Sequence, residues 1–282
     1  AGGGGGGSSS IGGNGGGAVI LTAGGTMTLD GLVSANANDS VGNYGGGGAG
    51  GSIYINSGNL NGTGTLRANG GGAGPYGGTS GGGGRIAVNT SDSNTSSLNI
   101  TANSVRGDTG YAGAGTIYIN DGGAPRLTVS NGGNAAGYRT DISSAIAGTK
   151  TLTLVSLSMT NAQLTFDNTV APLITSNASF SGTNSLAISS LTMASDFAFA
   201  GATLQQESTT TLTFIGNLTM LSGSRITTAA NPGGGRLYAV NLNVIGNMDV
   251  QPGASIDVDG LGYAGGVSGG AGFGTGGGVG NN

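Results

Sequence analysis

The chain has 282 residues, and its 8 basic and 12 acidic side chains give a formal net charge of −4. The charged fraction is 7%, against about 25% in ordinary soluble domains. The bases stand singly, which excludes a basic surface that follows a nucleic-acid backbone. Cysteine and histidine are absent, which excludes disulfides, thiolate nucleophiles and the commonest general base. No apolar run is long enough to span a bilayer, so membrane insertion is not expected.

Glycine runs stand at both ends of the chain, where residues 1–17 and 261–282 hold 11 glycines each. A free oligoglycine tail has the largest backbone entropy to lose and no side chain to bury. Because both runs flow into β-type sequence, we expect them to be docked, against a second copy of the chain. Their backbones are expected to pack side by side, either as extended, polyproline-II-like strands or as tight turns.

Four β-type segments of one pattern recur in the first half, at intervals of 34, 33 and 31 residues. They begin at Ala18, Ser52, Arg85 and Thr116. Each is followed by a second apolar segment, the last of them at 126–131, and then by a glycine-rich return. Repeats of this size are typical of a solenoid rather than a sandwich. We therefore predict an all-β fold, a parallel β-helix with glycine-rich loops.

The middle of the chain differs in composition, because residues 140–230 contain only 5 glycines. A weaker sequence repeat occurs there, in segments that begin at Ser156, Ser190, Asn217 and Asn241. An antiparallel β-sandwich is the alternative fold for this part. The composition divides the chain into a glycine-rich solenoid part (1–139), a glycine-poor strand part (140–230) and a C-terminal assembly segment (231–282).

Tyrosine precedes the glycine run in the internal loops. We predict that four tyrosines act as lids over the packed glycines, with the apolar ring on the glycines and the hydroxyl in contact with water. They are Tyr44, Tyr76, Tyr111 and Tyr263. The alternative is that these rings stack on sugars.

The C-terminal run starts a loop of the same kind, with Tyr263, but no strand follows it. The N-terminal run supplies a glycine stretch that leads straight into a strand, so we predict that the two runs are halves of one loop shared between neighbouring copies. The predicted assembly interface comprises Gly2, Gly7, Ile11, Gly17, Ala18, Ile20, Tyr263, Phe273, Gly278 and Asn282.

Carboxylates are the main candidates for chemistry. Asp257 and Asp259 share a strand face by their spacing, and Asp249 lies near them in sequence. A solvated strand edge is the simplest interpretation, with a Ca²⁺ site or an acid pair as alternatives. Other aspartates lie near strand ends, where Asp ordinarily caps turns. We predict no catalytic residue, no metal site and no cofactor.

Several stretches carry a resemblance to a known class of proteins, namely residues 51–55, 62–70, 81–88 and 257–266. They resemble the glycine-rich β-helical repeats of very large secreted bacterial surface proteins. The resemblance covers residues 1–130 and 240–282. It implies a β-helical architecture and an extracellular or cell-surface location, and it carries no catalytic residue across.

These features predict a structural protein and not an enzyme. The expected function is a subunit or tandem repeat of an extracellular filament, whose partners are other copies joined head to tail. The first alternative is a surface adhesin that binds a glycan or a receptor. A β-helical carbohydrate-active enzyme is a third hypothesis, and the absence of histidine and the low charge weigh against it.

Overall fold

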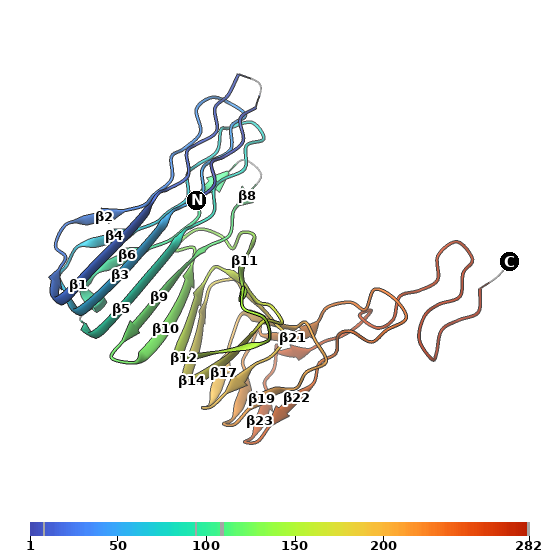
Figure 1. Ribbon diagram of the computed structural model, residues 1–282. Coiled ribbons are helices and arrows are strands. Elements are labelled where there is room, and N and C mark those ends of the chain that lie inside the picture. The colour runs from blue at the N-terminus through green and yellow to red at the C-terminus, as the bar shows by residue number, and fades with distance from the viewer. Residues whose placement is uncertain (8, 94, 108–109, 281–282) are drawn as a thin grey trace. The chain divides into compact units, whose positions relative to one another are not determined.

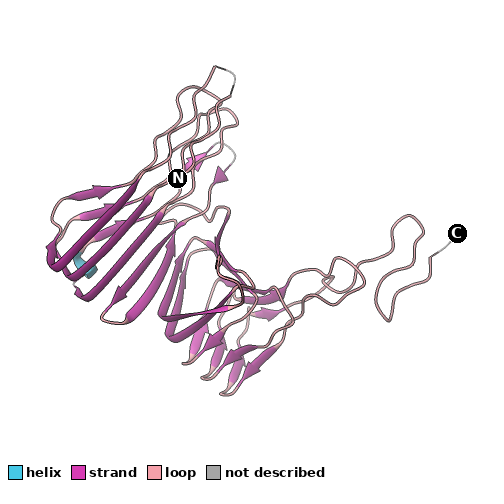
Figure 2. Cartoon of the chain, viewed as in Figure 1, coloured by secondary structure: helices cyan, strands magenta, loops and turns pink. Residues whose placement is uncertain are grey.

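The computed structural model describes residues 1–7, 9–93, 95–107 and 110–280. In these residues the protein is all-β, with strands in several mostly parallel sheets and one short 3₁₀ turn at Thr95–Ser97 (Figures 1 and 2). The chain forms two compact units. The first holds Ala1–Thr140, Leu154–Leu164 and Ala178–Asn184, and the second holds Asp141–Thr153, Thr165–Asn177 and Ser185–Asn282. The segment boundaries expected after residues 139 and 230 stay predictions, because the units interleave in sequence.

The first unit contains one long and two small sheets. Its long sheet includes β1 (Ala18–Thr28), β3 (Ser52–Asn61), β5 (Arg85–Ser93), β9 (Gly115–Asp121) and β10 (Ala124–Ser130). The small sheets contain β2 (Leu32–Ser34), β4 (Thr65–Arg67) and β6 (Asn99–Thr101), and β7 (Arg106–Gly107) and β8 (Gly110–Tyr111). Five strands contribute residues to both units: β11 (Arg139–Ile142), β12 (Lys150–Thr160), β13 (Gln163–Phe166), β14 (Val170–Ser181) and β15 (Asn184–Ile188).

The register of the long strands confirms the spacing predicted from the sequence. Ala18 pairs with Ser52, Ser52 with Arg85, and Arg85 with Thr116, all in parallel. Alternate side chains of these strands face a thin core that is closed by the sheet β2-β4-β6. Ile53, Ile86 and Leu66 are at most 1% exposed within it. Because side chains alternate along a strand, the intervening residues form the outer face of the sheet.

The strand direction reverses between β9 and β10. Gly122 and Gly123 have φ of 57° and 80°, the positive values that a two-residue type I′ hairpin turn requires. β10 therefore runs antiparallel to β9, and β12 then continues parallel to β10. The expectation that residues 126–131 form the second strand of a parallel rung is wrong. The Asp-Gly-Gly sequence at 121–123 is the hairpin signal that separates this turn from the preceding ones.

The buried face of the sheet changes at the same hairpin. Directly opposed residues of an antiparallel pair point to the same face, and the half-buried Tyr118 and Thr116 stand opposite Leu127 and Val129. Leu127 and Val129 are buried. On β9 the buried side chain is that of Ile117, which lies between Thr116 and Tyr118 and therefore points to the other face. The core beneath β1 to β9 and the core that begins at β10 thus lie on opposite faces.

The second unit has three sheets, each with its strands in parallel. It contains β16 (Thr192–Met193), β17 (Phe197–Phe199), β18 (Ala202–Gln206), β19 (Leu212–Phe214), β20 (Leu218–Met220), β21 (Arg225–Thr228), β22 (Leu242–Val244), β23 (Met248–Val250) and β24 (Ser255–Ile256). The orders are β16-β19-β22, β17-β20-β23 and β18-β21-β24, and β14 precedes β16 in the first. Every described pair from β14 onward is parallel, which does not fit the antiparallel sandwich considered for this region.

The structural repeat of the second unit differs from the repeat predicted from the sequence. Leu218, next to Asn217, pairs with Phe197 and Met248, in a different sheet from Thr192. The expectation that the Ser190 and Asn217 segments are equivalent is therefore wrong, because the true equivalent of Thr192 is Thr213. The structural repeat is Leu-x-x-Ile-Gly-Asn at 212–217 and 242–247. Its turn is bridged by the Asn217 side-chain oxygen, which accepts the Asn247 N–H at 2.8 Å.

Candidate functional site: glycine loops and end rungs

Three glycine-rich loops of equal length, 17 residues, lead into β1, β3 and β5. They comprise residues 1–17, 35–51 and 68–84, and each starts with an alanine. Figure 1 shows them side by side beyond the ends of these strands. The N-terminal run thus has the length of the two internal loops, and its pairing with the C-terminal run of a neighbouring copy stays a prediction.

The hydrogen bonds of these loops repeat every third residue. The N–H groups of Gly46, Gly47 and Gly48 donate to Gly5, Thr79 and Asn38 at 2.8, 2.9 and 3.2 Å. The next three N–H groups, of residues 49–51, donate to the same three extended segments, at Gly2, Gly82 and Ala35. These segments belong to the preceding loop, the following loop and the other half of loop 35–51. A period of about three residues with no internal hydrogen bond is the geometry of polyproline II. The loops thus form a bundle of extended strands, as one of the two expected arrangements proposed.

Close approach explains why glycine fills these positions. A Cβ atom on Gly81 would overlap the carbonyl oxygen of Gly48, and one on Gly47 would overlap that of Gly71. Neither glycine has a positive φ, so an L-residue is excluded by space and not by backbone conformation. Gly45 to Gly48 are buried although they carry no side chain.

The N-terminal run is docked on the next loop of its own chain. The Gly13 and Gly16 N–H groups donate to Gly46 and Ala49, both at 2.9 Å. Among the predicted interface residues, Gly7 lies against Tyr44 and Ile11 bridges to Val41. Gly2, Gly17, Ala18 and Ile20 are exposed on this outermost rung, Ile20 by 73%.

The C-terminal run is folded differently. The described hydrogen bonds of residues 264–280 are local, such as Gly272 to Gly278 at 2.9 Å and Phe273 to Ala264 at 3.1 Å. Tyr263 packs on Gly274 within the same segment, while Phe273 is 48% exposed. Gly278 has open space around it. Asn282, also predicted at the interface, lies outside the described residues.

The four predicted lid tyrosines do not form one set. Tyr44 and Tyr76 lie at the tips of adjacent loops, with their ring centroids 5.9 Å apart, and both are more than half exposed. Tyr111 is half-buried in β8, and Tyr263 belongs to the C-terminal run. The structure therefore pairs two of the four rings.

The last rung, β22 to β24, exposes positions that the preceding rung buries. Leu218, Met220 and Ile226 are 0% exposed, whereas their partners in the last rung are 42 to 45% exposed. The register pairs Leu218 with Met248, Met220 with Val250, and Ile226 with Ile256. This surface was not expected from the sequence, although the repeat at 212–217 and 242–247 indicates that the two segments are equivalent.

The acidic residues near the C-terminus serve the local backbone. Asp257 forms an ion pair with Arg225 at 2.9 Å and accepts the Asp259 N–H at 3.0 Å. Within the described ranges, no group of three acidic side chains is placed to hold a metal ion. Those same ranges contain no helix with the length and apolar character to cross a bilayer. Comparisons with models of known families, with curated proteins and with solved structures found no match.

Proposed function

We propose that this chain is a structural segment of an extracellular filament, a parallel β-solenoid whose rungs continue head to tail into a neighbouring copy. The observation that carries the proposal is the apolar surface of the last rung, formed by Met248, Val250 and Ile256. The resemblance of the glycine-rich repeats to those of secreted surface proteins supports the extracellular location.

The strand registers support a solenoid. Successive parallel strands of the first unit are offset by 34, 33 and 31 residues, and β19 and β22 of the second unit by 30. Each offset corresponds to one rung that passes through two or three sheets before it returns. A rung of this kind satisfies its backbone hydrogen bonds on its neighbours and needs only a thin core.

Uncovered end rungs favour end-to-end association. Burying one exposed aliphatic side chain contributes about 1.5–3 kcal/mol, and the edge strands add unpaired N–H and C=O groups. Terminal repeats of soluble solenoids usually present a polar outer face. Met248 and Val250 are exposed apolar side chains, so the last rung does not present a polar outer face.

The N-terminal loop supplies the complementary end. Gly2, Gly5 and Gly17 have open space where a Cβ would stand, in contrast to the filled positions of the inner loops. Extended glycine strands pair with further strands of the same kind. The proposed occupant is the C-terminal glycine run of the neighbouring copy.

A charge on the last rung tests this function. We expect the unmodified chain to sediment as concentration-dependent oligomers and to form regular fibres in electron micrographs, and Val250→Lys to stay monomeric. The control is Ile146→Lys, which places the same charge on another exposed aliphatic residue away from both ends. Monomers of the unmodified chain at every concentration, or fibres from Val250→Lys, would contradict the proposal.

Mixing two variants tests the head-to-tail arrangement. Lysine on an edge strand blocks strand addition, so Ile20→Lys on β1 is expected to block the opposite end. Each variant alone should be monomeric, and their mixture should form dimers through the two intact ends. An absence of dimers in the mixture would exclude head-to-tail contact.

A further inference from the structure

The outer face of the β3-β5-β9 sheet carries aligned columns of side chains. Tyr54, Ala87 and Tyr118 occupy one register position on successive strands. Their side chains share the outer face, where Tyr54 is 41% exposed and Tyr118 is half-buried. Because two strand spacings separate the tyrosines, their Cα atoms are about 9.5 Å apart. Ala87, which stands between the two tyrosines, carries only a methyl group.

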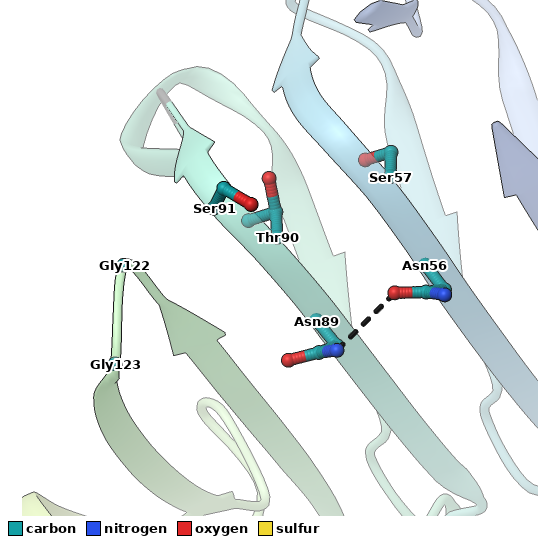
Figure 3. A pocket seen from close by; sticks show the side chains of 7 residues that line it. All are labelled: Asn56, Ser57, Asn89, Thr90, Ser91, Gly122 and Gly123. Atoms are coloured by element: carbon teal, nitrogen blue, oxygen red, sulfur yellow. Dashed lines mark hydrogen bonds between the residues drawn. The ribbon is translucent and has the colours of Figure 1, made fainter. Parts of the chain in front are cut away.

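An asparagine ladder runs next to the tyrosine column. Asn89 Nδ2 donates to Asn56 Oδ1 at 3.2 Å, the contact drawn in Figure 3, and Asn120 Nδ2 donates to Asn89 Oδ1 at 2.9 Å. These bonds fix the orientation of the three amides. Each amide nitrogen carries a second N–H, and Asn89 is exposed to solvent. The ladder thus presents pre-oriented donors on the outer face.

An open polar hollow of about 400 Å³ adjoins the ladder. It lies where β9 turns back at Gly122 while β5 continues, and it is lined by Asn56, Asn89 and the hydroxyl residues 57, 90 and 91. Figure 3 shows Ser57 on β3 with its hydroxyl directed toward β5. Ser57 is 6% exposed, and its Oγ has no hydrogen-bond partner in the described structure. Every lining group is uncharged.

We infer that this outer face binds a neutral carbohydrate chain. The gap between Tyr54 and Tyr118 fits a sugar ring, whose apolar faces stack on aromatic side chains. The asparagine amides match the paired donors and acceptors of neighbouring sugar hydroxyls. The hollow then receives the hydroxyl groups of the next unit, with the exposed Ser91 as a partner. A ligand of this kind requires no charge, in agreement with the lining.

The site contains no residue of either end rung, although Tyr54 stands next to Ile20 of β1 in the sheet. Its residues belong to β3, β5 and β9, which have a strand on each side in the sheet. A filament would repeat the site once in every copy, so binding to a long polysaccharide would be multivalent. The measurement therefore belongs in the Val250→Lys background, in which avidity does not mask the intrinsic affinity.

Affinity electrophoresis through gels cast with one polysaccharide each tests the inference. The probes are hydroxyethyl cellulose, laminarin and galactomannan as neutral polymers, and alginate as an acidic one. We expect retardation by at least one neutral polymer that persists at high salt. Retardation by alginate alone, lost at high salt, would assign the contact to the exposed Arg85 of the adjacent column and would overturn the inference.

Variants locate the contact on the protein. Tyr54→Ala is expected to weaken binding about tenfold, the loss of one stacked ring, and Ala87→Leu to weaken it by filling the gap. Tyr76→Ala removes a ring of similar exposure from a loop tip and serves as the control. Lack of binding to every neutral polymer would overturn the inference, as would unchanged binding by Tyr54→Ala or a loss confined to Tyr76→Ala. A cooperative urea transition for every variant, with a folded baseline under the conditions of the gel, excludes unfolding as the cause.

Discussion

The two glycine runs have the same glycine content and different structures. Residues 1–17 and 261–282 hold 11 glycines each, yet Gly13 and Gly16 are buried while residues 274–280 are exposed. The N-terminal run donates hydrogen bonds to a parallel loop one rung away, whereas the described hydrogen bonds of residues 264–280 stay within that segment. Composition alone therefore does not decide whether oligoglycine is ordered.

The neighbouring segments account for this difference. A polyproline-II strand has no internal hydrogen bonds, so its N–H and C=O groups need partners on adjacent strands. Loop 35–51 stands one rung from the N-terminal run and supplies them. The described chain places no comparable loop in register with the C-terminal run, which forms turns such as the one at Gly274, with φ of 80°.

Adding one methyl group to each environment gives the largest expected contrast. Gly81→Ala places a Cβ on the carbonyl oxygen of Gly48, and overpacking of this kind costs about 1–3 kcal/mol. Gly278→Ala has open space and the same non-positive φ, so it should be neutral or slightly stabilising. Urea denaturation of both variants measures the difference.

Close packing of the glycine loops also predicts which backbone hydrogen bonds Gly81→Ala weakens. In Gly81→Ala, hydrogen exchange should accelerate at Gly71 and Gly74, whose N–H groups bond to loop 35–51, while the strand β3 stays protected. Equal free energies of unfolding for the two alanine variants would show that the glycine loops are not close-packed in solution.

Removing the side chain of Asn231 should loosen the segment that precedes the C-terminal run. Its Oδ1 accepts the N–H groups of Leu237 and Tyr238 at 2.7 and 2.9 Å, and its Nδ2 donates to Leu261 at 3.1 Å. Asn231 is 7% exposed, so Asn231→Ala is expected to cost about 1–3 kcal/mol. Asn231→Asp, which keeps the acceptor, should cost less, and faster exchange at residues 237–238 should accompany Asn231→Ala alone.

Truncating the tyrosines should have the smallest effect. Tyr44 and Tyr76 are largely exposed, so Tyr76→Ala is expected to lower the free energy of unfolding by less than about 1 kcal/mol. Tyr76→Phe keeps the ring and should match the unmodified chain. Tyr263→Ala should leave the cooperative transition unchanged, because its ring packs on Gly274 of the exposed C-terminal run. A larger cost for Tyr263→Ala would show that the run is part of the cooperative fold.

Two expectations succeeded because their physical basis is local. The four strand starts at Ala18, Ser52, Arg85 and Thr116 were found from spacing alone, and the register follows the same residues. Close packing of glycine backbones was expected as one alternative because only glycine permits it. In both cases each short segment carries its own signal.

Other expectations failed because several pairings satisfy the same local pattern. The segment at 126–131 has the pattern of any β-strand, and only the Gly122-Gly123 turn makes it reverse direction. Similarly, the segment at Asn217 matches the one at Ser190 in composition, but a short turn places it in a different sheet. The exposed last rung was missed because exposure depends on what stacks beside a strand.

The sequence by itself determined the β-rich character, the rung spacing of the first unit and the need for glycine at close-packed loop positions. These follow from side-chain alternation and from the volume of a Cβ atom, which are properties of short segments. The tertiary structure alone decided that residues 1–17 dock on loop 35–51, that the core changes faces at β9 and β10, and that β22 to β24 stay uncovered. Each of these depends on contacts between residues far apart in the chain, for which many partners have a suitable pattern and packing selects one.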